Sequence, residues 1–304
     1  MRKHEVGIVR RVRRTGFVKL LRTSPPKTVC PNFYILAHAD GCAFRPSCAY
    51  CYLKASLWRL GKPHLFVNVE RMEREIIDWI NSDGLQTCVL NSGNLSDSLC
   101  FESERPVMAR LVEMFRAHAE ARRRPHSLLI VTKGGTEQCR PLLETEPCAN
   151  VIVSFSVNNP AAARRYEAGA PPVADRLDAA RRLRKAGWRV RIRLDPMIAG
   201  FDYRRIALAI RRLEPERITL GTLRAEPSLY RFAGSALFRD LERPPRSAKG
   251  YVLARYPRET RVEMYRQVIR ILGRGRPIGL CEETRDVWLD VGLEPDKAEC
   301  NCGA

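Results

Sequence analysis

Three cysteines stand within ten residues near the amino end of the chain. They are Cys42, Cys48 and Cys51 of the segment GCAFRPSCAYCYLK, with five residues in the first gap and two in the second. Thiolates at such short spacing are typical metal ligands, and three of them leave one position of a four-coordinate site open for chemistry. Zinc suits this spacing, and so does an iron–sulfur cluster with one free iron. The spacing alone leaves both open.

The composition bears on the compartment and the partners of the protein. Its 304 residues include 53 Lys and Arg against 34 Asp and Glu, for a net charge of +19. A charge of this size favours polyanions such as nucleic acid, although arginine-rich chains also come from GC-rich genomes. The basic amino end lacks the apolar stretch of a secretory signal, and no apolar run approaches the roughly 20 residues of a membrane span. We therefore expect a cytoplasmic protein whose eleven cysteines are mostly thiols or metal ligands.

Short apolar runs alternate with helical patterns from about residue 33 to residue 223. This order predicts right-handed βαβ units around a parallel sheet. Six such units predict an α/β fold, a partial (β/α)6 barrel rather than a closed barrel of eight strands. The expected strands are NFYILAH (32–38), TCVLNSG (87–93), SLLIVTKGG (127–135), NVIVSFSVN (150–158), WRVRIRLDPMI (188–198) and RITLGTL (217–223).

The same pattern divides the chain into three parts. Residues 1–29 are expected to form a basic amino-terminal arm, residues 30–225 the barrel, and residues 226–304 an extension with three further cysteines. The cysteine loop follows the first expected strand, where α/β barrels place their active sites. Its position therefore favours a catalytic role for the loop.

The cysteine loop resembles the signature loop of radical S-adenosylmethionine enzymes. The run CAYCYL (48–53) is particularly similar to the spore photoproduct lyase branch, and the resemblance covers about residues 30–225. The usual first gap in that family is three residues, so the gap of five is a departure. The resemblance implies a partial barrel of the radical S-adenosylmethionine type and a [4Fe–4S] cluster on Cys42, Cys48 and Cys51. It also implies S-adenosylmethionine on the fourth iron, a 5′-deoxyadenosyl radical that takes hydrogen from the substrate, and a flavodoxin- or ferredoxin-type electron donor.

The resemblance also implies contacts to S-adenosylmethionine from residues at successive strand ends. Each of these side chains is, by itself, equally compatible with an ordinary hydrogen bond at the rim of the sheet. Together they favour a site, and glycine in the second-strand motif would let the backbone approach the cofactor. The expected contacts are Tyr50 for the adenine, Ser92, Gly93 and Asn94 for the methionine amine, Lys133 for the carboxylate, Ser154 and Ser156 for the ribose, and Arg176 and Arg193 as further carboxylate candidates.

The chain departs from the lyase pattern where hydrogen returns to the product. The lyases use a cysteine in the loop after the second strand, and alignment on Ser96-Asp97 puts Asn94 at that place. Cys100 lies six residues further on and is a candidate hydrogen donor. The alternative for Cys100 is a packed thiol, which is the usual state of a single free cysteine.

The extension adds Cys281, Cys300 and Cys302, for which several roles stay open. They are candidates for a second iron–sulfur cluster, with Cys139 or Cys148 as a fourth ligand, or for a zinc clip. They are also candidates for a hydrogen-donating thiol or for inert thiols. Two other cysteines, Cys30 and Cys88, are flanked by apolar or strand residues and are expected to be buried and structural.

The leading interpretation is a radical S-adenosylmethionine enzyme of the spore photoproduct lyase type, acting on an anionic substrate. DNA or a nucleotide comes first because of the charge and the resemblance, and a base in a duplex would have to flip out to react. A small-molecule or peptide substrate is the second interpretation. The non-enzymatic alternative is a zinc-bearing protein that binds nucleic acid through its basic segments.

Overall fold

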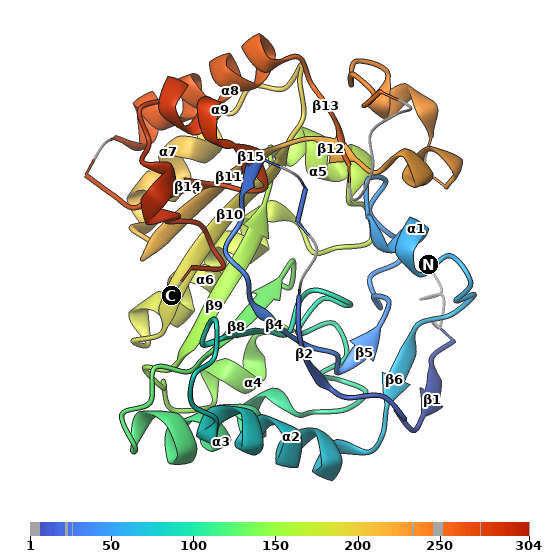
Figure 1. The fold of residues 1–304 in the computed structure, drawn as a ribbon, viewed down its shortest axis with the longest axis vertical. Coiled ribbons are helices and arrows are strands. Elements are labelled where there is room, and N and C mark those ends of the chain that lie inside the picture. The colour runs from blue at the N-terminus through green and yellow to red at the C-terminus, as the bar shows by residue number, and fades with distance from the viewer. Residues whose placement is uncertain are drawn as a thin grey trace.

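The computed structural model describes residues 7–21, 24–25, 27–232, 234–245, 252–273 and 275–303, and an eight-stranded sheet runs through its centre (Figure 1). The strand order is β14-β11-β10-β9-β8-β7-β4-β2. Neighbouring strands are parallel from β14 to β4, and β2 is antiparallel at the edge. The strands are β2 (Val18–Leu20), β4 (Tyr34–Leu36), β7 (Val89–Asn91), β8 (Ser127–Thr132), β9 (Val151–Val157), β10 (Arg189–Met197), β11 (Arg217–Thr222) and β14 (Ile278–Leu280).

Helices alternate with the strands along the chain, which confirms the expected α/β class and the six expected strands. The apolar side chains of alternate strand positions and of the helices share the main core. Of the helices described, those that accompany the sheet are α2 (Val69–Asn81), α3 (Met108–Phe115), α4 (Arg140–Leu143), α6 (Val173–Lys185), α7 (Arg204–Leu213) and α8 (Arg258–Leu272).

The two faces of the sheet differ in character, as the alternation along β9 illustrates. Val151, Val153, Phe155 and Val157 enter the main core, where the helices pack. Ile152, from the other face, joins a smaller apolar cluster. The period of two places Ser154 and Ser156 on that same second face, so the polar strand residues lie opposite the helix layer.

Segments from both ends of the chain complete the sheet. Strand β2 pairs with β4, and β14, from the expected extension, pairs with β11. A short antiparallel pair, β3 (Thr28–Val29) with β15 (Glu283–Thr284), brings the two ends together. The other described strands are β1 (Val9–Arg11), β5 (Ala39–Asp40) and β6 (His64–Phe66), which form a three-stranded sheet, and the pair β12 (Arg224–Ala225) and β13 (Ala254–Arg255).

The remaining helices are short and lie mainly around the ends of the strands. No helix among the described residues is long and apolar enough to span a bilayer. These helices are α1 (Leu53–Ser56), α5 (Pro160–Tyr166), α9 (Arg285–Asp290), the π-helix η1 (Arg116–Glu120) and the 3-10 helices η2 (Pro227–Arg231), η3 (Ser235–Phe238) and η4 (Pro295–Lys297).

Candidate active site

The cysteine loop lies between β5 and α1, and its backbone is hydrogen-bonded to neighbouring segments. The amide of Gly41 donates to the carbonyl of Leu95, and that of Ala49 donates to Tyr166. The loop also passes directly over Gly169, where a Cβ atom would come within 2.3 Å of the Pro46 carbonyl oxygen. Glycine is required there because the two backbones approach too closely for any side chain.

The three thiols of this loop are near neighbours. Cys42, Cys48 and Cys51 are free cysteines that interact with one another electrostatically. Burial raises the pKa of Cys48 to about 12, although the ammonium of Lys133 opposes the rise. Within the part of the chain that the structure describes, no three His, Cys, Asp or Glu side chains are gathered for one metal ion. In a cubane cluster each thiolate binds a different iron. Three neighbouring thiols therefore fit that group without converging on one metal ion.

A buried network centred on Glu167 holds Tyr50 beside the thiols. The phenol of Tyr50 donates to Glu167, and Asn158 Nδ2 donates to the same carboxylate at 3.1 Å. Lys133 places its ammonium 5.8 Å from the centre of the Tyr50 ring. Burial tends to raise the pKa of Glu167, but Lys133 and Arg176 outweigh it and hold the pKa below its usual value. Glu167 is therefore a buried carboxylate, and nothing in the sequence pattern singled it out.

The two arginines expected as further carboxylate candidates each pair with a protein carboxylate. Arg176 is 1% exposed, pairs with Glu167 at 2.5 Å and donates to the carbonyl of Ser156. Arg193 donates to Asp195 at 2.6 Å. Each guanidinium is thus neutralised by a carboxylate of the protein, and a cofactor contact by either arginine stays a prediction.

Hydrogen bonds to Asp97 hold the loop after β7 against the loop after β8. Asp97 accepts from the amide of Lys133 at 2.6 Å and from the hydroxyl of Thr132 at 2.8 Å. Burial raises the pKa of Asp97, and these hydrogen bonds oppose the rise. At Gly93 a Cβ atom would lie 2.6 Å from Val131, so only glycine lets this loop pack on β8. Asp97 thereby ties together the two loops that carry the expected cofactor contacts.

The expected serine contacts differ in their partners. Ser92 Oγ is 2.8 Å from Ser98 Oγ and also contacts the carbonyl of Leu129 at 3.2 Å, so it is engaged within the loop. Ser154 Oγ is fully buried and has no hydrogen-bond partner among the described residues. Ser156 is 7% exposed on the same face of β9. The two β9 serines therefore stay candidates for contact with a cofactor.

Asn94, which the sequence comparison places at the lyases' cysteine, lies next to a tyrosine. The phenol of Tyr52 donates to the carbonyl of Asn94. Cys100 lies elsewhere in the same loop, where its sulfur accepts from the amide of Ala43 at 3.3 Å, beside Cys42. The hydrogen bond from Cys100, followed by burial, raises the pKa of Cys42. The sequence pattern indicated Cys100 as a candidate hydrogen donor but gave no sign of a role for Tyr52.

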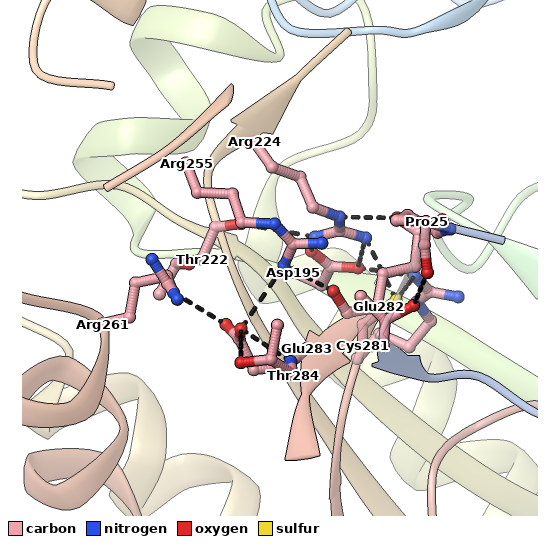
Figure 2. Close-up of polar contacts among 12 residues, drawn as sticks. Pro25, Asp195, Thr222, Arg224, Arg255, Arg261, Cys281, Glu282, Glu283 and Thr284 are labelled. Atoms are coloured by element: carbon pink, nitrogen blue, oxygen red, sulfur yellow. Dashed lines mark hydrogen bonds and ion pairs between the residues drawn. The ribbon is translucent and has the colours of Figure 1, made fainter. Parts of the chain in front are cut away.

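A second polar network lies at the ends of β10 and β14 (Figure 2). Figure 2 shows Arg224 directed at Asp195, Glu282 and Cys281. Its guanidinium nitrogens lie 2.8 Å from Asp195 Oδ1, 2.7 Å from Glu282 Oε2 and 3.1 Å from Cys281 Sγ. Arg193 also donates to the sulfur of Cys281, at 3.3 Å. Burial tends to raise the pKa of Asp195, but Arg224 and Arg193 hold it well below its usual range. Cys281 is therefore a thiol between two guanidinium groups.

The tail cysteines gather around the second face of the sheet. Cys302 interacts electrostatically with Cys300, Cys281 and Cys30. Arg217 donates to the carbonyl of Cys300 at 3.0 Å, which holds the tail across β11. Three segments of the chain thus bring four thiols together.

Two expectations for the other cysteines are wrong. Cys139 and Cys148 are buried in the main core, among helix and strand side chains, so neither completes a set with the tail thiols. Cys30 is only partly buried and is the cysteine that accompanies the tail. Cys88 is likewise only partly buried.

Comparisons with known proteins agree with this geometry. The model of the family described as spore photoproduct lyase matches residues 4–211, more than half of the chain. The structure of spore photoproduct lyase complexed with dinucleoside spore photoproduct is similar, with a TM-score of 0.71 at 20% identity over 90% of this chain and 82% of that chain. A mutant of spore photoproduct lyase with bound AdoMet and dinucleoside spore photoproduct gives 0.70 at 19% identity over 91% and 82%. No curated protein matches the chain. The chain therefore belongs to the spore photoproduct lyase family of radical S-adenosylmethionine enzymes, which use a [4Fe–4S] cluster and S-adenosylmethionine.

Proposed function

We propose that this enzyme acts on DNA and repairs spore photoproduct or a closely related lesion. The observation that carries the proposal is the group of three free, neighbouring thiols of Cys42, Cys48 and Cys51 beside the buried Tyr50–Glu167 network. The family supports the reaction class, and the relative with dinucleoside spore photoproduct supports the substrate class. The net charge of +19 favours a polyanion. Family membership removes the zinc-bearing, non-enzymatic alternative, and a small-molecule or peptide substrate stays the second candidate.

The fold proposed with this function is the partial (β/α)6 barrel of residues 30–225 in a cytoplasmic enzyme. The basic arm (1–29) and the extension (226–304) supply β2 and β14 at the two edges of the sheet. A flavodoxin- or ferredoxin-type protein is proposed as the electron donor.

We propose that Cys42, Cys48 and Cys51 hold the [4Fe–4S] cluster and that the second face of the sheet holds S-adenosylmethionine. The bound cofactors would supply a 5′-deoxyadenosyl radical that takes hydrogen from the substrate. Tyr50, fixed by Glu167, orients the loop for the adenine, and Gly93 permits close backbone approach. Lys133 offers an ammonium to a carboxylate, and the unpartnered Ser154 hydroxyl offers a hydrogen bond. Cys100, Cys281, Cys300 and Cys302 stay candidate hydrogen-donating or auxiliary thiols.

The direct test is anaerobic reaction of the reconstituted enzyme with dithionite, S-adenosylmethionine and an oligonucleotide that contains spore photoproduct. We expect 5′-deoxyadenosine and restored thymines because the site combines the cluster thiols with a lesion-binding family fold. Chromatography with mass spectrometry measures both products. The control is the undamaged oligonucleotide. Cofactor cleavage with an unchanged lesion would contradict repair and favour another substrate.

A second iron–sulfur site is supported by the convergence of Cys30, Cys281, Cys300 and Cys302. The guanidinium N–H groups on Cys281 are hydrogen-bond donors of the kind that tune cluster sulfurs. We expect about eight irons per wild-type chain, from two [4Fe–4S] clusters, and about four after Cys281, Cys300 and Cys302 are all replaced by serine. Iron and sulfide analysis after anaerobic reconstitution measures this difference. An equal iron count in the two proteins would show that the tail thiols hold no cluster.

A further inference from the structure

Exposed aromatic side chains occur beside the cysteine loop. Three large aromatic residues are strongly exposed within the described chain, namely Tyr52 at 42%, Trp58 at 58% and Phe232 at 40%. Two of them lie at the ends of α1, and Phe232 directly follows η2. Contact between water and large apolar rings is unfavourable, so a local group of them indicates a binding surface.

Two of the three rings are already stacked on each other. The ring centres of Trp58 and Phe232 lie 6.3 Å apart with an angle of 25° between the planes, and the guanidinium of Arg59 lies 5.0 Å from the centre of Trp58. Helix α1 packs against η2, and Ala55 and Leu229 of these elements share one buried apolar cluster. The packing of α1 against η2 thus fixes the orientation of the exposed faces of Trp58 and Phe232.

Arginines without a carboxylate partner among the described residues lie on the segments around the pair. Arg59 and Arg231 adjoin it in sequence, and Arg45 and Arg243 lie on the cysteine loop and just beyond η3. All four side chains are exposed, and none forms an ion pair with a carboxylate of the described residues. Most ion pairs elsewhere in the described chain involve arginine. These four arginines form none, so their charges are available to an anion from outside the protein.

The pair also lies next to the proposed reaction centre. Helix α1 begins directly after Tyr52, whose phenol donates to the carbonyl of Asn94 in the loop after β7. Glu226, the residue before η2, is an electrostatic neighbour of the same tyrosine. The elements that carry Trp58 and Phe232 therefore border the cysteine loop.

We propose that Trp58 and Phe232 form a stacking platform for bases of a DNA strand next to the lesion, with Arg59 and Arg231 contacting its phosphates. The proposal rests on the proposed function and names the surface that would hold the substrate. Aromatic rings beside unpaired arginines suit single-stranded nucleic acid because every base has a stacking face and every linkage carries a charge. A base flipped from a duplex leaves neighbouring bases that such a platform can hold.

Tryptophan fluorescence tests this directly because three of the four tryptophans are buried. Trp79, Trp188 and Trp288 are at most 5% exposed, so quenching by a bound base reports mainly on Trp58. We expect a single-stranded oligothymidylate, added to the anaerobic holoenzyme, to quench the emission. An acidic peptide of equal charge should not, since it offers no base to stack. Equal quenching by the peptide would show attraction by charge alone and overturn the platform.

Affinity measurements with a labelled oligothymidylate complete the test. We expect Trp58→Ala and Phe232→Ala each to weaken binding by on the order of tenfold. Leu289→Ala is the matched control, because Leu289 is 62% exposed on α9, and should bind as the wild type does. Arg59→Ala should lower the slope of log Kd against log salt by about 1. Wild-type affinity in both aromatic variants would refute the proposal.

The outcome for this surface is separable from that for repair. Wild-type enzyme that repairs the lesion, together with Trp58→Ala enzyme of equal affinity and equal repair, would refute the platform and leave the proposed function intact. Quenching and tenfold weaker binding without any lesion repair would support the platform and contradict the proposed function. The Trp58→Ala enzyme should in either case keep its iron content, since Trp58 lies beyond α1 and is not one of the proposed cluster ligands.

Discussion

The Cys48→Ala enzyme is expected to lose the absorbance of the cluster at the cysteine loop, with about four fewer irons per chain, and to form no detectable 5′-deoxyadenosine. Cys48 is the central thiol of the loop and interacts with both Cys42 and Cys51. Two remaining thiolates cannot supply three irons of a cubane, so both the cluster and the position for S-adenosylmethionine would be lost. Iron, sulfide and product analysis after anaerobic reconstitution measure the effect.

The control for this variant is Cys88→Ala. Cys88 is a partly buried free thiol at the start of the β7 region, and its carbonyl, not its sulfur, accepts the hydrogen bond from Ser127. We expect this variant to keep the first cluster and the cleavage activity. A Cys48→Ala protein that still carries sulfide at this loop and still cleaves S-adenosylmethionine would refute the cluster assignment.

Arg176→Met should lower the free energy of unfolding by about 3–5 kcal/mol. Arg176 and Glu167 are each only 1% exposed in their side chains, so removal of the cation leaves a buried carboxylate with a weaker counterion. The double variant Arg176→Met with Glu167→Gln should recover part of the loss because it removes the buried charge as well. Anaerobic urea unfolding measures each free energy, and the four proteins form a double-mutant cycle.

The surface pair on the same helix is the matched control. Arg182 contacts Asp178 at 2.7 Å, but its side chain is 60% exposed, so Arg182→Met should cost no more than about 1 kcal/mol. An equal loss in the two arginine variants would contradict a special role for the buried pair.

The cost of Arg176→Met should also depend on pH. The pKa of Glu167 lies below its ordinary value of 4.5 in the folded enzyme, because Lys133 and Arg176 outweigh the burial that would raise it. A depressed pKa means that the pair stabilises the fold above pH 4.5, and that this stabilisation is lost as the pH falls below that value. The difference between wild type and variant should therefore shrink in acid.

The sequence predicted the order of strands well because local patterns determine them. Runs such as VIVSFSV are rich in β-branched and aromatic residues, and the alternation of Ser154 and Ser156 with apolar residues correctly placed them on one face. The cysteine loop could also be recognised from the sequence, because its three cysteines are close together in the chain. Both features depend on neighbours along the chain.

Residues whose roles depend on distant partners could not be found in this way. Arg176 lies nine residues from Glu167, but which carboxylate it would neutralise follows from the turn between α5 and α6. Tyr52 contacts Asn94 only because the cysteine loop folds over the end of β7. Cys30 joins Cys300 because β3 and β15 pair across the whole length of the chain. Such contacts are properties of the tertiary fold.

The β3–β15 pair has a consequence for how the enzyme matures. Its two strands come from opposite ends of the chain, and such long-range pairing carries the greatest loop-closure entropy, so it is expected among the last contacts to form. Cys30 directly follows β3, and Cys281 lies just before β15. The four thiols at this junction thus assemble only when folding is nearly finished. If these thiols hold the proposed second cluster, iron could be loaded there only after the two ends of the chain have paired.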